Sequence, residues 1–154
     1  MLLTPPERTT RIRRKTALLC LAHGWAPLHE VPMANGRRAD ILALRPDGGF
    51  VCIEVKSDAN DFRADRKWHE YREFSDALYF AVDLDFPLAL LPEETGLIVA
   101  DETAEILRQA PAHPLAPARG RAVLQRFAML AGLRLASMDD PLGAAMLRAA
   151  LLSE

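Results

Sequence analysis

The polar and apolar positions of the first 24 residues predict a helix. Thr4-Pro5-Pro6-Glu7 has the spacing of a capping box with proline in the first turn, which marks a helix start. The helix is expected to run to about His23 and to stop at Gly24. Its first half is basic and its second half is apolar, so we expect one end to lie in solvent and the other in the core.

Three strands are expected next, because three apolar runs are each bounded by turn signals. They are expected at about 28–33, 38–45 and 50–56. Asn35-Gly36 predicts a tight turn between the first two, and Pro46-Asp47-Gly48-Gly49 predicts one between the second and the third. The pattern therefore indicates an antiparallel meander.

The second half of the chain predicts a crossover and then a helical end. A helix is expected over 61–74, with Asn60 or Asp61 as its cap, followed by a short buried strand at 79–83. Strand, helix and strand imply a right-handed crossover with parallel pairing. The remaining expected elements are strands at 96–101 and 104–109, which are candidates for a hairpin, and helices at about 118–136 and from Asp140-Pro141 to Leu152.

These elements predict the fold class α/β, with a mixed sheet. The order α-β-β-β-α-β is followed by a β-hairpin and two helices. We expect a single domain over 1–154, with its core at about 5–110 and a C-terminal helical part at about 117–152. The proline-rich stretch 111–117 is expected to be a linker inside this domain.

Composition restricts the class of protein. The 154 residues carry a formal net charge of −2, and 50% are hydrophobic and 26% charged. These values argue against disorder and against a generally basic nucleic-acid binder. No window approaches 18 continuous apolar residues, which argues against a membrane span, and the N-terminus lacks the order of a signal peptide, so a cytoplasmic location is expected. Cys20 and Cys52 are too few for a zinc cluster or a disulfide framework.

Asp40, Glu54 and Lys56 are the most informative charged residues, because they lie in adjacent apolar strands. Glu54 and Lys56 are two positions apart and so share a face of the sheet. If the turn consists of the three residues 47–49, Asp40 lies opposite Lys56 on that same face. A two-residue turn would place Asp40 on the other face, so the clustering depends on the register.

Two carboxylates and an ammonium at one spot suit the hydrolysis of a phosphodiester. Carboxylate oxygens bind Mg²⁺, the metal polarises a phosphate and acidifies water, and a lysine positions that water or stabilises charge. A salt-bridge ladder on a solvated face is the alternative. Charged side chains inside the apolar segments ADILAL and VCIEVK are costly unless they serve a purpose, which favours the functional interpretation.

The same residues resemble a known superfamily. Asp40, followed by Glu54-Val55-Lys56 between a β-hairpin and a helix, resembles the PD-(D/E)XK nucleases, which have the restriction-endonuclease-like fold. The position before Asp40 is Ala39 rather than proline, a departure from the motif. More specifically, the chain resembles the MmcB family of bacterial DNA repair proteins over most of 28–110, through GRRADILAL (36–44), IEVKSDANDFRADRKWHEYREFSDALYFAVD (53–83) and LPEETGLIVADETAEIL (91–107).

The resemblance implies roles for individual residues. Asp40 and Glu54 would bind Mg²⁺ or Mn²⁺, the backbone carbonyl of Val55 would be a further ligand, and Lys56 would be the catalytic lysine. The accessory candidates are Glu30, an acidic residue upstream of the motif, and Lys67, on the helix after it.

Cations near this cluster are candidates for contacts with DNA. Arg37 and Arg38 enter the strand that carries Asp40 and could grip a phosphate, although an exposed strand end explains them equally well. Three cations share one side of the first helix and could contact backbone phosphates, although a solvated helix face is the favoured explanation. They are Arg8, Arg11 and Lys15.

The function expected from these observations is DNA repair through metal-dependent hydrolysis of DNA. One alternative is a catalytically silent accessory that binds DNA. A second is a protein-interaction module of a repair complex, in which the charged cluster is a structural ladder. DNA is the expected partner, with a homodimer or a repair-complex protein as a further possibility.

Overall fold

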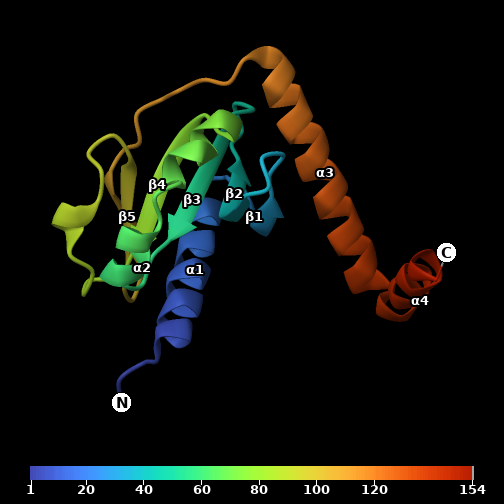
Figure 1. Ribbon diagram of the computed structural model, residues 1–154, viewed down its shortest axis with the longest axis horizontal. Coiled ribbons are helices and arrows are strands. Elements are labelled where there is room, and N and C mark those ends of the chain that lie inside the picture. The colour runs from blue at the N-terminus through green and yellow to red at the C-terminus, as the bar shows by residue number, and fades with distance from the viewer. Residues whose placement is uncertain (154) are drawn as a thin grey trace. The chain divides into compact units, whose positions relative to one another are not determined.

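The computed structural model describes residues 1–153 and shows an α/β protein with a six-stranded mixed sheet (Figure 1). The strands run over Ala26–Pro32 (β1), Arg38–Leu44 (β2), Phe50–Val55 (β3), Ala77–Val82 (β4), Gly96–Ala100 (β5) and Ala104–Arg108 (β6). The α-helices run over Pro5–Ala22 (α1), Ala59–Ala64 (α2), Pro117–Asp139 (α3) and Pro141–Leu152 (α4), and the 3₁₀ helices over Trp68–Phe74 (η1) and Leu88–Leu90 (η2).

The sheet follows the order of the chain, β1-β2-β3-β4-β5-β6. β1, β2 and β3 pair antiparallel, β3, β4 and β5 pair parallel, and β6 returns antiparallel to β5. The predicted meander, crossover and hairpin are all confirmed. Each was predicted from local features of the sequence, namely apolar runs bounded by turn residues.

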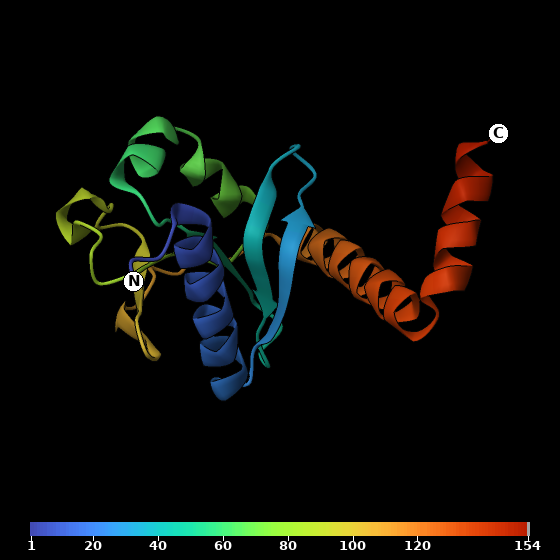
Figure 2. The ribbon, with the colours of Figure 1, turned by 90° about the horizontal axis from the view of Figure 1, so that it is seen from below.

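Apolar side chains cover both faces of the sheet, and the helices α1 and α2 lie on opposite sides of it (Figure 2). On one face α1 packs through Ile12 and Cys20, and on the other Phe62 of α2 packs on Phe80 of β4. The residues of α1 that are buried lie four apart, at Ile12, Thr16 and Cys20. The expectation that one end of this helix is buried is therefore wrong: the helix buries a stripe along its length.

The start of α1 agrees with its predicted capping box. The backbone N–H of Thr4 donates to a carboxylate oxygen of Glu7 at 2.7 Å. At its other end the chain turns through Gly24, whose φ of 73° favours glycine.

The crossover between β3 and β4 is not the continuous helix expected over 61–74. Helix α2 begins after Asp58, whose carboxylate accepts from the backbone N–H of Asn60 at 2.8 Å, so Asp58 is the cap rather than Asn60 or Asp61. The helix ends at Ala64, and Asp65 adopts an extended backbone. The Asp65 carboxylate accepts from the backbone N–H of Lys67 at 3.0 Å, which stabilises the break before η1.

The turn between β2 and β3 differs from the predicted one by one position. The backbone N–H of Arg45 donates to the carbonyl of Gly49 at 2.9 Å, so the turn consists of Pro46, Asp47 and Gly48. Gly48 takes the left-handed conformation, with φ of 87°. Leu42 therefore pairs with Cys52, and the register is shifted by two residues from the one that would place Asp40 opposite Lys56.

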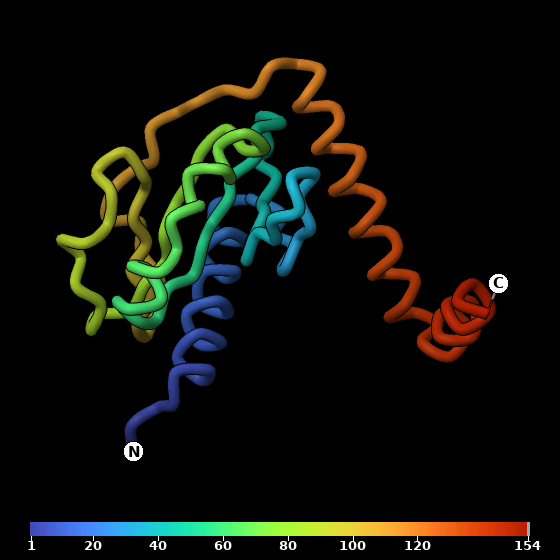
Figure 3. The backbone as a smooth tube through the Cα atoms, in the orientation of Figure 1, coloured from blue at the N-terminus to red at the C-terminus, as the bar shows by residue number. Residues whose placement is uncertain are grey.

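The chain divides into two compact units, with the boundary between Gly120 and Arg121. Residues 109–116 form an irregular connection from β6 to α3 within the first unit (Figure 3). The predicted core at about 5–110 lies in the first unit, and the second consists of helical residues. The single-domain organisation stays a prediction. None of the helices in residues 1–153 is both long enough and apolar enough to span a membrane.

Candidate active site

The end of the β2–β3 pairing brings Asp40 and Glu54 together. Regular pairing stops at Ile41 and Ile53, and the next positions in this register are Asp40 and Glu54. The backbone N–H of Asp40 donates to Glu54 Oε1 at 3.2 Å, and the backbone N–H of Val55 donates to Asp40 Oδ2 at 2.8 Å. The two carboxylates are thus held by backbone groups. Because a shift of two residues preserves the face, they share a face as predicted, although Asp40 lies opposite Glu54 rather than Lys56.

The same arrangement directs the carbonyl of Val55 toward the site. In a strand, the N–H and C=O of one residue point to the same neighbouring strand. The N–H of Val55 bonds to the Asp40 carboxylate on the β2 side, so its carbonyl faces that side too. The structure thus gathers two carboxylates and one carbonyl, the donors expected from the sequence.

Both carboxylates are destabilised in their charged forms. Glu54 is only 4% exposed. Its pKa is raised to about 9, first because burial penalises the carboxylate and then because Asp40 carries like charge. The pKa of Asp40 is also raised, by burial above all, and the hydrogen bond from Val55 opposes this effect. A buried acid and a half-buried acid in contact, both with raised pKa values, favour a bound cation electrostatically.

Lys56 lies at the same pocket but bonds elsewhere. Its ammonium Nζ contacts Asp65 Oδ2 at 2.9 Å and Asp61 Oδ2 at 3.9 Å. Burial lowers the pKa of Lys56, but the bond to Asp65 and the charges of Asp65, Asp61 and Glu54 outweigh burial, so its pKa is raised. Lys56 is therefore positively charged, and its ammonium is held by Asp61 of α2 and by Asp65, the residue after α2.

These residues line one polar hollow of about 440 Å³. Arg37 and Arg38 also line it, and they differ in their contacts. Arg37 Nε pairs with Glu70 at 2.8 Å. Arg38 is exposed, while its backbone carbonyl accepts from the hydroxyl of Tyr71 at 3.0 Å. Arg38 is thus the more exposed of these two candidates for phosphate contact.

The accessory candidates Glu30 and Lys67 do not join the cluster. Glu30 lies on β1 in the register position opposite Asp40, but its backbone has a φ of 49° and its carboxylate pairs with Arg13 at 3.6 Å. Lys67 is exposed in the break before η1. Neither is among the residues that line the hollow.

Sequence reasoning missed the acidic partners of Lys56. Asp61 and Asp65 line the hollow, whereas the expected continuous helix used Asp61 only as a candidate cap and gave Asp65 no role. The sequence carries little that would predict an ion pair between Lys56 and Asp65, which lie nine residues apart. Asp65 reaches Lys56 only because the helix ends at Ala64, and that break depends on tertiary contacts.

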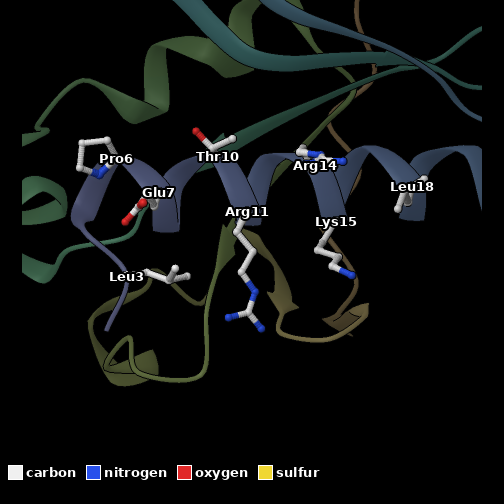
Figure 4. Close-up of a pocket in the computed structure, with 8 residues that line it drawn as sticks. All are labelled: Leu3, Pro6, Glu7, Thr10, Arg11, Arg14, Lys15 and Leu18. Carbon is white, nitrogen blue, oxygen red and sulfur yellow. The ribbon is translucent and has the colours of Figure 1, made fainter. Parts of the chain in front are cut away.

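The three cations of α1 that were candidates for DNA contact lie in different environments. Arg8 forms a bidentate pair with Asp83, at 2.8 and 2.9 Å. Arg11 pairs with Asp101 at 2.9 Å. Arg11 and Lys15 extend from the same side of α1 beside a separate hollow of about 530 Å³, which Figure 4 shows. Of the three, Arg11 is exposed, and Arg8 and Lys15 are half-buried.

Arg8→Ala is expected to lower the free energy of unfolding by about 1–2 kcal/mol, because the bidentate pair to Asp83 is partly buried. DNA affinity is expected to stay within about twofold. Urea unfolding and a fluorescence anisotropy titration with labelled DNA measure the two quantities. Arg14→Ala, an exposed arginine of the same helix, is the matched control. A large loss of DNA affinity at unchanged stability would contradict this assignment.

Comparison with known proteins shows the family of this chain. A family model described as DNA repair protein MmcB-like matches residues 4–142. The chain belongs to the MmcB-like family. The match confirms the resemblance seen in the sequence and places this MmcB-like protein in a family of DNA repair proteins. No curated protein matches the chain.

One solved structure is similar to this MmcB-like protein over nearly its full length. It is the SPO1766 protein of unknown function from Silicibacter pomeroyi, with 43% sequence identity and a TM-score of 0.83. The match covers 92% of this chain and 95% of that one. The similarity supports the fold of the MmcB-like chain and carries no activity with it.

The donor set of the MmcB-like site fits a hard divalent cation. No three His, Cys, Asp or Glu side chains of residues 1–153 are grouped to hold one metal, so side chains alone do not complete a coordination shell. Mg²⁺ typically keeps several waters and takes only one or two carboxylates. Asp40, Glu54 and the carbonyl of Val55 match that requirement, and softer metals that need histidine or thiolate ligands do not fit.

Proposed function

We propose that this MmcB-like protein hydrolyses phosphodiester bonds in DNA with Mg²⁺ or Mn²⁺ held by Asp40 and Glu54. The observation that carries the proposal is the pairing of the buried Glu54 carboxylate with the half-buried Asp40 carboxylate at the end of the β2–β3 ladder, beside a charged lysine. The proposal also agrees with the PD-(D/E)XK resemblance of these residues and with the DNA repair family.

The contacts of Lys56 argue against a simple structural ladder. A cross-strand ladder would pair the ammonium of Lys56 with Asp40 or Glu54. The ion pairs of Lys56 are instead with Asp65 and Asp61. The acid pair on β2 and β3 is left without a cross-strand cation, although its burial makes such a partner valuable.

The residues of the chain have distinct roles in the proposed reaction. A bound Mg²⁺ supplies positive charge that polarises the scissile phosphate and acidifies water. Asp40 and Glu54 would hold the ion, and the N–H of Val55 orients Asp40. Lys56 lines the same hollow and stays protonated because it bonds to Asp65. It would therefore stabilise the charge of the phosphate by a hydrogen bond, rather than act as a base. Arg38 would contact a neighbouring phosphate.

The direct test is cleavage of a panel of DNAs. Single-stranded, duplex, branched and crosslinked substrates are incubated with Mg²⁺ or Mn²⁺, with the wild type beside Glu54→Gln. We expect products only from the wild type and only with metal, since glutamine lacks the charge that binds the ion. Glu105→Gln, an exposed strand glutamate, is the matched control and is expected to cleave like the wild type.

Two results would contradict the proposal. If the wild type binds DNA at low salt but cleaves none of the panel with either metal, the protein is a DNA-binding accessory. If Glu54→Gln cleaves as fast as the wild type, the site is wrongly assigned.

A further inference from the structure

The polar hollow of the candidate active site contains two groups of acids that compete for Lys56. Asp40 and Glu54 lie on β2 and β3, whereas Asp61 lies on α2 and Asp65 directly after it. Glu54 and Lys56 are two positions apart and so share a face of the sheet. Their backbones are about 7 Å apart, a distance that a flexible four-carbon side chain can span. The ammonium of Lys56 could therefore also pair with Asp40 and Glu54.

The structure shows the pairing with the other group. Lys56 Nζ lies 2.9 Å from Asp65 Oδ2 and 3.9 Å from Asp61 Oδ2. The Lys56 side chain is 9% exposed, and the side chains of Asp65 and Asp61 are 22% and 65% exposed. The pair with Asp65 is thus both the shorter and the better shielded from water, so it contributes most to holding the ammonium.

The carboxylate of Asp65 is fixed by two contacts. One oxygen, Oδ2, accepts from Lys56 Nζ, and the other, Oδ1, accepts from the backbone N–H of Lys67 at 3.0 Å. The backbone of Lys56 is fixed as well, because its N–H donates to the carbonyl of Ala81 at 3.0 Å. A change of partner by Lys56 would therefore involve its side chain alone.

We propose that Asp65 is a positioning residue that holds the ammonium of Lys56 away from Asp40 and Glu54, so that these two carboxylates stay available to a divalent cation. The inference rests on the proposed function, because it concerns the same cation site. An ammonium paired with the two carboxylates would neutralise part of the charge that attracts the ion. The apparent affinity for the ion then falls in proportion to the fraction of molecules whose site is still open.

Asp65→Asn in the full chain tests this role, because it removes the charge and keeps the shape. An amide offers one oxygen where the carboxylate offers two, so it cannot replace both hydrogen bonds. Titration calorimetry is expected to show about tenfold weaker Mn²⁺ binding than in the wild type, since Lys56 then blocks the site in about nine of ten molecules. Asp61→Asn is the matched control. It removes a charge from the same hollow at the longer and more exposed contact, and we expect Mn²⁺ affinity to stay within about threefold.

The double variant Lys56→Met/Asp65→Asn separates this role from a merely structural one. If Asp65 acts through Lys56, the double variant binds Mn²⁺ as tightly as Lys56→Met alone, because the blocking ammonium is absent. The proposal is overturned if Asp65→Asn weakens binding equally in the presence and absence of Lys56, since Asp65 would then act on the ion directly or on the fold of the crossover. It is also overturned if Asp65→Asn binds Mn²⁺ like the wild type.

Glu54→Gln distinguishes a failure of this inference from a failure of the proposed function. If the wild type binds Mn²⁺ and Glu54→Gln does not, the cation site is correctly assigned, and the variants at position 65 decide the role of Asp65 alone. If the wild type binds no Mn²⁺, or if Glu54→Gln binds it equally well, the cation site is wrongly assigned, and the proposed function and this inference are both overturned.

Discussion

Lys56→Met is expected to slow DNA cleavage about 1,000-fold without weakening Mn²⁺ binding. The substitution keeps an apolar stem of similar length and removes the charge that stabilises the phosphate in the transition state, a loss typically worth two to three orders of magnitude. The removed charge is positive, so its loss leaves the attraction between a cation and the Asp40–Glu54 pair at least as strong. Single-turnover cleavage measures the rate, and titration calorimetry measures Mn²⁺ binding.

Lys67→Ala is the matched control for this experiment. Lys67 is an exposed lysine beyond the hollow, and its removal is expected to change the cleavage rate by less than about threefold. If Lys67→Ala loses as much activity as Lys56→Met, then the lysine after the motif belongs to the site, as the superfamily resemblance implies. If Lys56→Met cleaves normally, then Lys56 serves only to hold the crossover segment through Asp65.

The face on which the site residues lie was predictable, because strand alternation is robust to an error in register. The predicted turn at 47–49 is displaced by one residue from the observed Pro46-Asp47-Gly48, and the resulting pairing moves by two positions. An even shift leaves every side chain on its original face. Asp40 and Glu54 therefore meet, although through a different pairing from the one expected.

The partner of Lys56 was not predictable, because it depends on how a helix breaks. Local propensity favours one helix over 61–74, and nothing in its charge pattern marks a stop at Ala64. The break exists because the Asp65 carboxylate bonds to both the Lys56 ammonium and the Lys67 backbone N–H. Tertiary contacts of this kind override helix propensity, which differs by less than 1 kcal/mol among most residues.

The role of a basic helix face was also beyond sequence reasoning. Spacing alone groups Arg8 with Arg11 and Lys15, but Arg8 lies within reach of Asp83, 75 residues along the chain. The spacing of residues along a helix predicts which side chains share a face. Which of those side chains form an ion pair and which lie in solvent depends on the tertiary structure.

Glu54→Gln is expected to stabilise the metal-free protein, and increasingly so as the pH rises. The pKa of Glu54 in the folded protein is about 9, against an ordinary value of 4.5. Between these two values the folded protein binds more protons at Glu54 than the unfolded chain does, so the stability contributed by this group is full below pH 4.5 and is lost as the pH rises toward 9. Glutamine resembles the protonated acid and cannot ionise, so the variant escapes this loss.

The expected difference is large enough for equilibrium unfolding to resolve. A pKa difference of one unit corresponds to about 1.4 kcal/mol. Part of the raised pKa of Glu54 comes from the charge of Asp40, so only part of the full difference is assigned to Glu54 alone. We expect Glu54→Gln to be about 2–3 kcal/mol more stable than the wild type at pH 9 and nearly equal to it at pH 4.5. Urea unfolding in EDTA at a series of pH values measures this difference, with Glu105→Gln expected to stay within about 0.5 kcal/mol of the wild type throughout. Adding Mn²⁺ should reverse the order, because the ion binds the charged wild-type pair and offsets the repulsion that destabilises it. Equal pH dependence in the wild type and Glu54→Gln would mean that Glu54 is not held as a buried acid, and the cation site would lose its electrostatic basis.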